Sequence, residues 1–281
     1  MSDILQKRLV FAPWADPRTR RLPGTIPVDA ADWLLIDDAF GAQMALRDRL
    51  IGGTPERVHR LAPECATAAG ELYAWIIGLL PGRGYDFGAD GAIRRPDGVT
   101  VRPDPSRPLL TLGRLVAEDL CLMMPGGEAR DAGHDTGHDA GQDGDQDEHV
   151  LGGAILCFPA GWTLEQKFMR PMMRIHRPVA KYTEDIGRRV QRLLDGIRPG
   201  MGLLRGTAHH SNAPLHNPRT EEQGRAPEGD LPFIRVERQC LFRLPETGAV
   251  VFSIHTSVVR PDDLDDHQRQ TLAEFPIREA A

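Results

Sequence analysis

The sequence predicts an α+β protein built on an antiparallel sheet. Helical and strand patterns are interspersed without βαβ alternation, no G-x-G-x-x-G motif or phosphate loop occurs, and the strongest strand signal is a hairpin near the C-terminus. With 281 residues, 41% of them hydrophobic, the chain can bury a large core. We expect an arm over residues 1–30 that packs through Phe11 and Trp14, one domain over 31–265, and a tail over 266–281.

Two helices are expected in the first third of the domain. The apolar pattern that starts at Trp33 predicts a helix that ends at the Gly52–Gly53 pair. Pro63 suits the first turn of a second helix, expected to run to Leu80, whose apolar side chains recur every three or four residues.

The next two segments have different patterns. Residues 109–124 fit either a strand that enters a short helix or two strands, and periodicity does not decide between them. Residues 126–149 are rich in Asp, Gly and His and carry no aliphatic side chain larger than Ala, so they are expected to form a flexible surface insertion.

A strand and a helix are expected after the insertion. The short apolar run from Val150 to Pro159 is bounded by breakers and predicts a buried strand. Thr183 suits the N-cap of a helix that ends at Arg198–Pro199–Gly200. One face of this helix carries an apolar stripe, formed by Ile186, Val190, Leu193, Leu194 and Ile197.

The hairpin occupies the C-terminal third. Residues 245–248 form its turn, and residues 249–259 its second strand. One face of the first strand is apolar, with Ile234, Val236, Cys240, Phe242 and Leu244. The other face holds Arg235, Glu237, Gln239, Leu241 and Arg243, so Arg238 is the one charged side chain on the apolar face.

Composition excludes several classes of protein. The net charge of -6, without a dense basic stripe, argues against nucleic-acid binding. The longest apolar run, residues 72–80, is too short to cross a membrane. Four cysteines without a C-x-x-C pair argue against a disulfide scaffold, a zinc ribbon and a cysteine-held iron–sulfur cluster. We therefore expect a cytoplasmic protein.

His176 is the first candidate for chemistry. It lies between Ile175 and a Pro178–Val179 pair that stiffens the backbone, shortly after Lys167. A neutral imidazole in such a frame can be an axial haem ligand, a general base, or a buried histidine whose hydrogen bonds are satisfied.

The second candidate group lies on the first strand of the hairpin. A buried arginine at 235 or 238 could bind a carboxylate such as a haem propionate, and a buried Glu237 could bind a small ammonium group. The alternative is an ordinary ion pair of Arg235 and Glu237 on a wet face, with Arg238 bound by a nearby acid. Arg205 is either a third anion clamp or a solvated loop arginine.

Other histidines have weaker patterns. Four side chains of the insertion could bind a metal, namely His134, Asp135, His138 and Asp139. A Gly-rich segment, however, lacks the fixed geometry of a metal site. Three further histidines lie in a polar stretch and are expected to face solvent: His209, His210 and His216.

A series of short motifs resembles a known family. In chain order these are Trp33 with Ile36–Asp37, Phe40 and Arg47; residues 116–120; Cys157–Phe158–Pro159 with Trp162 and Lys167; residues 175–179; and residues 235–239 with Arg243, Pro245 and Phe252. Over residues 10–260 the chain is similar to the haem-dependent oxidative N-demethylase family.

The resemblance implies a fold, an activity and partners. The fold would be a PAS-like antiparallel sheet with helices packed around a haem pocket. The activity would be that of an α-subunit-like monooxygenase that oxidises a small secondary amine, such as dimethylamine, with O2 and releases formaldehyde. The cofactor would be haem b, with electrons from NADPH through separate flavin and iron–sulfur partners, either a reductase or a ferredoxin-type subunit.

The resemblance also implies roles for residues. His176 would be the iron ligand, and Arg205 or Arg238 would bind the propionates, with Arg235 and Lys167 as further cofactor-binding side chains. Glu237 would hold the substrate ammonium near O2, with Arg238 as the second catalytic residue. In a regular strand, however, neighbouring side chains point to opposite faces, so Glu237 and Arg238 reach one pocket only if a bulge intervenes.

Two departures from the family pattern concern the substrate more than the haem. Residues 206–208 are Gly-Thr-Ala, where the family tends to have an Asn-Trp pair, and the insertion at 126–149 is atypical. Two other functions therefore stay open: a non-catalytic PAS-like haem gas sensor or haem-binding protein, and an interaction module that keeps the fold without haem.

Overall fold

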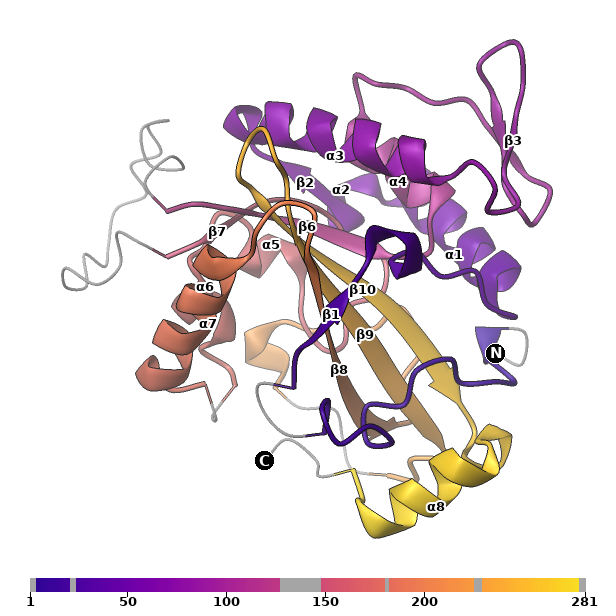
Figure 1. The fold of residues 1–281 in the computed structure, drawn as a ribbon, viewed down its shortest axis with the longest axis vertical. Helices are drawn as coiled ribbons and strands as arrows, with labels where there is room; N and C mark the ends of the chain where they lie inside the picture. Colours follow the sequence, from indigo (N-terminus) through magenta and orange to yellow (C-terminus); the bar gives the residue numbers. More distant parts are fainter. Residues whose placement is uncertain (1–3, 21–23, 127–147, 180–181, 225–228, 278–281) are drawn as a thin grey trace.

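A seven-stranded antiparallel sheet forms the centre of the protein (Figure 1), as seen in a computed structural model. The residues it describes are 4–20, 24–126, 148–179, 182–224 and 229–277. The insertion expected at 126–149 lies almost wholly outside them, including all four of its candidate metal ligands.

The strands of the main sheet stand in the order β1-β8-β9-β10-β6-β7-β2. Their bounds are β1 Ile26–Val28, β2 His59–Leu61, β6 Asp119–Met124, β7 Val150–Ile155, β8 Gly202–Ser211, β9 Phe233–Arg243 and β10 Val250–Val259. A separate three-stranded sheet projects from the body (Figure 1) and consists of β3 Asp86–Phe87, β4 Ile93–Arg94 and β5 Thr100–Val101.

Helices cover both sides of the main sheet (Figure 1). The α-helices are α1 Phe40–Gly53, α2 Pro55–Val58, α3 Ala66–Leu79, α4 Pro108–Leu115, α5 Leu164–Lys167, α6 Met172–His176, α7 Glu184–Gly196 and α8 Asp266–Glu274. Short 3-10 turns are η2 Ala30–Asp32, η3 Pro63–Cys65, η4 Glu221–Gln223 and η5 Pro261–Asp263.

The five central strands have the PAS arrangement. Counted in chain order from β6 to β10, they stand side by side as second, first, fifth, fourth and third. Helices α5, α6 and α7 lie in the connection between the second and third of them, β7 and β8. The predicted fold class, an α+β protein on a PAS-like antiparallel sheet, is therefore confirmed.

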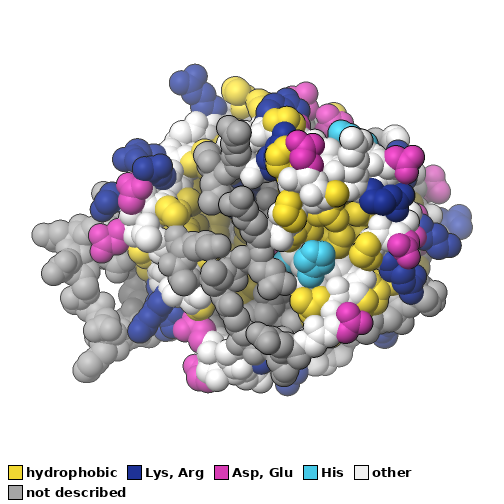
Figure 2. Space-filling model, turned by 90° about the horizontal axis from the view of Figure 1, so that it is seen from below, with side chains coloured by type: hydrophobic (Ala, Val, Ile, Leu, Met, Phe, Trp, Pro, Cys, Tyr) yellow, Lys and Arg dark blue, Asp and Glu magenta, His cyan; other side chains and the backbone are white. Residues whose placement is uncertain are grey.

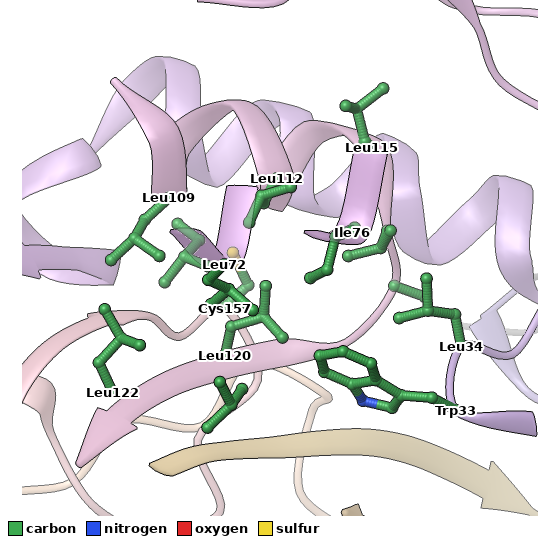
Figure 3. Packing of buried hydrophobic residues seen from close by; sticks show 14 of the residues in the cluster. Trp33, Leu34, Leu72, Ile76, Leu109, Leu112, Leu115, Leu120, Leu122 and Cys157 are labelled. Carbon is green, nitrogen blue, oxygen red and sulfur yellow. The ribbon is translucent and has the colours of Figure 1, made fainter. Parts of the chain in front are cut away.

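Alternation along each strand divides the core into two layers. Leu120 and Leu122 of β6 pack with α1, α3 and α4 in the larger cluster (Figure 3), whereas Cys121 and Met123 pack with α5, α6 and α7 in a second cluster. Successive side chains of a strand point to opposite faces, so a strand covered on both faces must be apolar throughout, as β6 is after its first residue. The second layer is the one that holds α6 against the sheet.

Several sequence predictions are confirmed in detail. The strands of the hairpin are β9 and β10, and they pair residue for residue from Arg243 with Val250 to Ile234 with Val259. The Thr183 hydroxyl accepts a hydrogen bond from the Ile186 amide and caps α7.

Neither alternative for residues 109–124 is correct. These residues form neither a strand followed by a helix nor two strands, because the helix α4 comes first and the strand β6 follows it.

The start of the first helix was predicted wrongly, and one strand was not predicted at all. The first helix begins at Phe40 and not at Trp33, because Asp37 uses its carboxylate to bind the Ala39 amide and the His255 ring instead of joining a helix. Residues 202–211 form the strand β8, although they contain two glycines and two adjacent histidines. Arg205 is therefore a strand residue and not a solvated loop arginine.

Both ends of the chain pack on the sheet. Trp14 is buried and its indole donates a hydrogen bond to the Gln268 carbonyl of α8, 2.9 Å away. Phe11 lies so close to Gly206 that a Cβ atom there would meet its ring at 2.3 Å. The residues expected as a tail from 266 thus contain a helix that contacts the arm.

Charges of both signs are interspersed over the described part of the face in Figure 2, around a group of hydrophobic side chains and a histidine. Among the described residues, no helix combines the length and the hydropathy needed to cross a membrane.

Candidate functional site

The candidate site lies on the sheet face that α5, α6 and α7 cover. Ile175 of α6 and Leu194 of α7 pack on this face against Leu241 of β9. Leu241, Gln239 and Glu237 alternate along β9 and so share that face. Arg205 pairs with Gln239, and Thr207 with Glu237, which brings both β8 side chains to the same face.

His176 ends α6 at the border of this face. Its Nδ1 lies 2.9 Å from the Met172 carbonyl oxygen, one helical turn earlier. Its ring stacks on Tyr182, with ring centroids 4.2 Å apart and an interplanar angle of 14°. Burial lowers the pKa of His176, the hydrogen bond to Met172 opposes this, and the nearby cations of Lys167 and Arg205 add to it. The resulting pKa is about 4, so the imidazole is neutral at pH 7.

A neutral His176 whose Nδ1 faces a carbonyl must donate the Nδ1 proton to that carbonyl. The other nitrogen, Nε2, then carries the free lone pair, which is the form that binds a metal ion. The Met172 carbonyl thus fixes the tautomer as well as the ring position.

Two cations flank His176. Lys167 ends α5, donates a hydrogen bond to the Ile175 carbonyl at 2.7 Å and lies 5.0 Å from the Trp162 ring centroid. Burial lowers the pKa of Lys167 to about 8, so most of it stays charged at pH 7. Arg205 is half-buried, and its Nε is fully buried without a hydrogen-bond partner in the described part of the chain.

Glu237 supplies the negative charge of the site. Its carboxylate accepts a hydrogen bond from the side-chain Nε2 of Gln239 at 2.9 Å, and its charge partly offsets the effect of burial on the pKa of Arg205. Among the described residues, no cation lies within 4.0 Å of this half-buried carboxylate to form an ion pair. Glu237 is therefore available to a small cation.

Arg238 lies on the opposite face from Glu237. The pairing of β9 with β10 continues through both residues without a shift, so no bulge brings them together. Arg238 donates hydrogen bonds of 2.7 Å to the Asp32 and Trp33 carbonyls and thereby holds η2 against the sheet.

Arg235 shares the face of Glu237 but is committed to backbone. It is 1% exposed and donates hydrogen bonds to the Leu215 carbonyl at 3.0 Å and the Phe158 carbonyl at 2.7 Å. These contacts hold two loops over the end of the site face, while the buried Nε of Arg235 has no hydrogen-bond partner within the described ranges.

The structure thus brings together His176, Lys167, Arg205 and Glu237 and separates Arg238 from them. It adds Tyr182, which sequence reasoning missed because a stack between two loop-linked rings has no periodicity. The expectation of solvent-facing histidines is wrong: His209, His210 and His216 are half-buried, the first two on β8 and the third bound through Nδ1 to the Cys157 carbonyl at 2.7 Å.

The chemistry of these residues fits a haem. A neutral imidazole with a free Nε2 is an axial ligand for iron, and a buried arginine Nε without a partner is a donor that a propionate would satisfy. Lys167 adds a second positive charge near the His176 imidazole.

Fold and site together define a PAS-like protein with a histidine at the border of a covered sheet face that presents a half-buried carboxylate. A sequence model of the family described as haem-dependent oxidative N-demethylase, alpha subunit-like, matches residues 24–276. The chain belongs to this haem-dependent oxidative N-demethylase alpha-subunit-like family. No curated protein matched the chain in a sequence search.

Proposed function

We propose that the protein is a haem b monooxygenase that removes a methyl group from a small secondary amine. The observation that carries the proposal is the placement of a neutral His176 beside the sheet face that presents the carboxylate of Glu237. A metal ligand and an ammonium-binding group are the two parts that oxidation of an amine at a haem needs.

His176 would hold the iron through Nε2, and Arg205 and Lys167 would bind the propionates. The haem, when bound, supplies the activation of O2. Overall, one oxygen atom of O2 ends in formaldehyde and the other in water, while two electrons and two protons are consumed and the amine loses one methyl group.

Glu237 would bind the substrate as an ammonium ion. One of its oxygens is fixed by Gln239, which leaves the other to accept a charge-assisted hydrogen bond from the N–H of the amine. Arg235 would act on the site by fixing the loops at Leu215 and Phe158, and Arg238 would support the sheet from behind.

The electrons would come from NADPH through separate flavin and iron–sulfur proteins, as the alpha-subunit-like character of the family suggests. All four cysteines are free and buried, which supports our assignment of the reaction to a reducing compartment such as the cytoplasm.

Glu237→Gln is expected to keep the haem spectrum but to weaken amine binding about 10-fold to 100-fold, because a charge-assisted hydrogen bond contributes about 1.5–3 kcal/mol. The measurement is a titration of the haem-loaded protein with dimethylamine, followed by the change in the Soret band. Glu246→Gln, which alters an exposed carboxylate in the hairpin turn, is the matched control and should bind the amine like wild type. Equal affinity in all three proteins would remove Glu237 from the proposed site.

The function itself is tested by turnover. Haem-loaded protein, supplied with O2, NADPH and a flavin and iron–sulfur electron-transfer pair, should release one formaldehyde for each dimethylamine consumed. If the reduced protein binds O2 but releases no formaldehyde from a series of small secondary amines, the monooxygenase proposal fails and a gas-binding role takes its place.

A further inference from the structure

Tyr182 is the residue of the site region for which the proposed function gives no role. Its ring stacks on His176 at 4.2 Å, yet its hydroxyl is buried and has no hydrogen-bond partner. A buried hydroxyl without a partner destabilises the fold, because it has lost its hydrogen bonds to water. The tyrosine is therefore kept at this place by what its ring contacts and not by a hydrogen bond within the described chain.

The orientation of His176 needs both of its contacts. The hydrogen bond from Nδ1 to the Met172 carbonyl restrains one atom of the ring, but a hydrogen bond tolerates a range of tilts of the ring plane. A ring stacked nearly parallel, at 14°, stops that rotation. Together the two contacts fix the plane in which Nε2 points.

Tyr182 is itself held in place from α7. It directly precedes Thr183, the N-cap of that helix. At Gly187, one turn into α7, an added Cβ would lie 3.5 Å from Cε1 of Tyr182 and 2.3 Å from the sulfur of Met173. The missing side chain thus lets α7, Tyr182 and α6 approach closely, and α6 is the helix that ends in His176.

We propose that Tyr182 is a positioning residue that fixes the plane of the His176 imidazole for iron binding through its stacked ring. The inference rests on the proposed function in one respect only, namely that His176 is the iron ligand. Side chains that orient a metal-binding histidine typically change metal affinity about 10-fold to 100-fold when they are removed.

The test compares Tyr182→Phe, which keeps the ring and loses the hydroxyl, with Tyr182→Leu, which loses both. Haem b is titrated into each apoprotein, and the absorption and ferric EPR spectra of the loaded proteins are recorded. We expect Tyr182→Phe to match wild type. Tyr182→Leu should bind haem about 10-fold to 100-fold more weakly, with a broadened distribution of EPR signals. Tyr182→Met takes its place if the leucine variant does not fold.

Two results would overturn the inference: wild-type haem affinity and spectra in the ring-less variant, or an equal loss in Tyr182→Phe, which would assign the effect to the hydroxyl. His176→Ala, measured alongside, separates this from the proposed function. If His176→Ala keeps the spectrum of wild type, the iron ligand is elsewhere and the proposed function loses its basis. If His176→Ala loses the wild-type spectrum and both Tyr182 variants keep it, the proposal on Tyr182 fails while the proposed function stands.

A measurement on the haem-free protein checks the stack independently. The Tyr182 ring shields the His176 ring protons, so their NMR resonances should move downfield in Tyr182→Leu and stay in place in Tyr182→Phe. Unchanged resonances in the leucine variant would show that the stack does not hold the imidazole.

Discussion

Replacement of Arg47 by methionine is expected to lower the free energy of unfolding by about 3–5 kcal/mol. The Arg47 side chain is fully buried and forms a 2.6 Å ion pair with Asp119. It also donates to the Gly113, Ala117 and Glu118 carbonyls, which lie in and after α4. The variant would leave the buried Asp119 carboxylate without its cationic partner and three carbonyls without the arginine that donates to them.

The effect should extend towards the candidate site. Asp119 also accepts hydrogen bonds from the amides of Cys157 and Phe158, at 2.7 and 2.8 Å, and the Phe158 carbonyl accepts one from Arg235. The buried pair therefore joins α1 to a loop at the edge of the site face.

Urea unfolding of the haem-free protein measures the loss. The matched control is Arg18→Met, because Arg18 forms a 2.7 Å ion pair with Asp16 at the surface, where solvent screens the charges, and its loss should leave the unfolding midpoint close to that of wild type. The double variant Arg47→Met with Asp119→Asn should recover part of the loss, since it removes the unpaired charge. An equal, small effect of the two single variants would contradict the assignment.

Replacement of His255 by glutamine is expected to cost about 3–5 kcal/mol at pH 6 and clearly less at pH 9. The ring lies between two buried carboxylates, with Nε2 3.1 Å from Asp37 and Nδ1 3.2 Å from Glu118. Burial opposes a charged ring, but the hydrogen bonds to both carboxylates overcome it and raise the pKa of His255 to about 9. Glutamine cannot neutralise the two acids.

The direction of the pH dependence follows from the raised pKa. In the unfolded chain His255 loses its proton near pH 6.5, whereas in the folded protein it keeps the proton to about pH 9. Its contribution is therefore complete below pH 6.5 and is lost as the pH rises through 9. Contact with His255 also lowers the pKa of Asp37 against the effect of burial, and that contribution is lost as the pH falls.

Urea unfolding at pH 6 and pH 9 measures this difference. His267→Gln, at an exposed position of α8, is the control and should stay within about 0.5 kcal/mol of wild type at both values. A loss in His255→Gln that is the same at pH 6 and pH 9 would show that the ring is not charged in the fold.

Alternation in β9 was sufficient to predict that Glu237 and Arg238 face opposite ways. It could not predict what each one contacts, because the partners of Arg238 lie about two hundred residues away at Asp32 and Trp33. Side-chain periodicity is a local property, whereas the partners of buried charges are set by the packing of distant segments.

The strand β8 escaped prediction for a related reason. Gly202 and Gly206 weaken any strand pattern, yet both are required by neighbours: an added Cβ would meet Phe242 at 2.2 Å at the first and Phe11 at 2.3 Å at the second. Since β8 carries Arg205, the missed strand also concealed that this arginine shares a face with Glu237. Likewise, the spacing of His176 and Tyr182 gave no sign that their rings stack.

His176 as the ligand of iron is the central element of the proposed site. The decisive measurement is the absorption spectrum of the haem-loaded protein in the ferric, dithionite-reduced and CO-bound states, recorded for wild type and His176→Ala. A parallel sample of the variant contains added imidazole, which can take the place of the missing side chain. His267→Ala serves as the control for the loss of an imidazole. We predict histidine-ligated spectra for wild type and the control, loss of that signature in His176→Ala, and its return with imidazole. A His176→Ala protein with the wild-type spectrum in all three states would contradict the account.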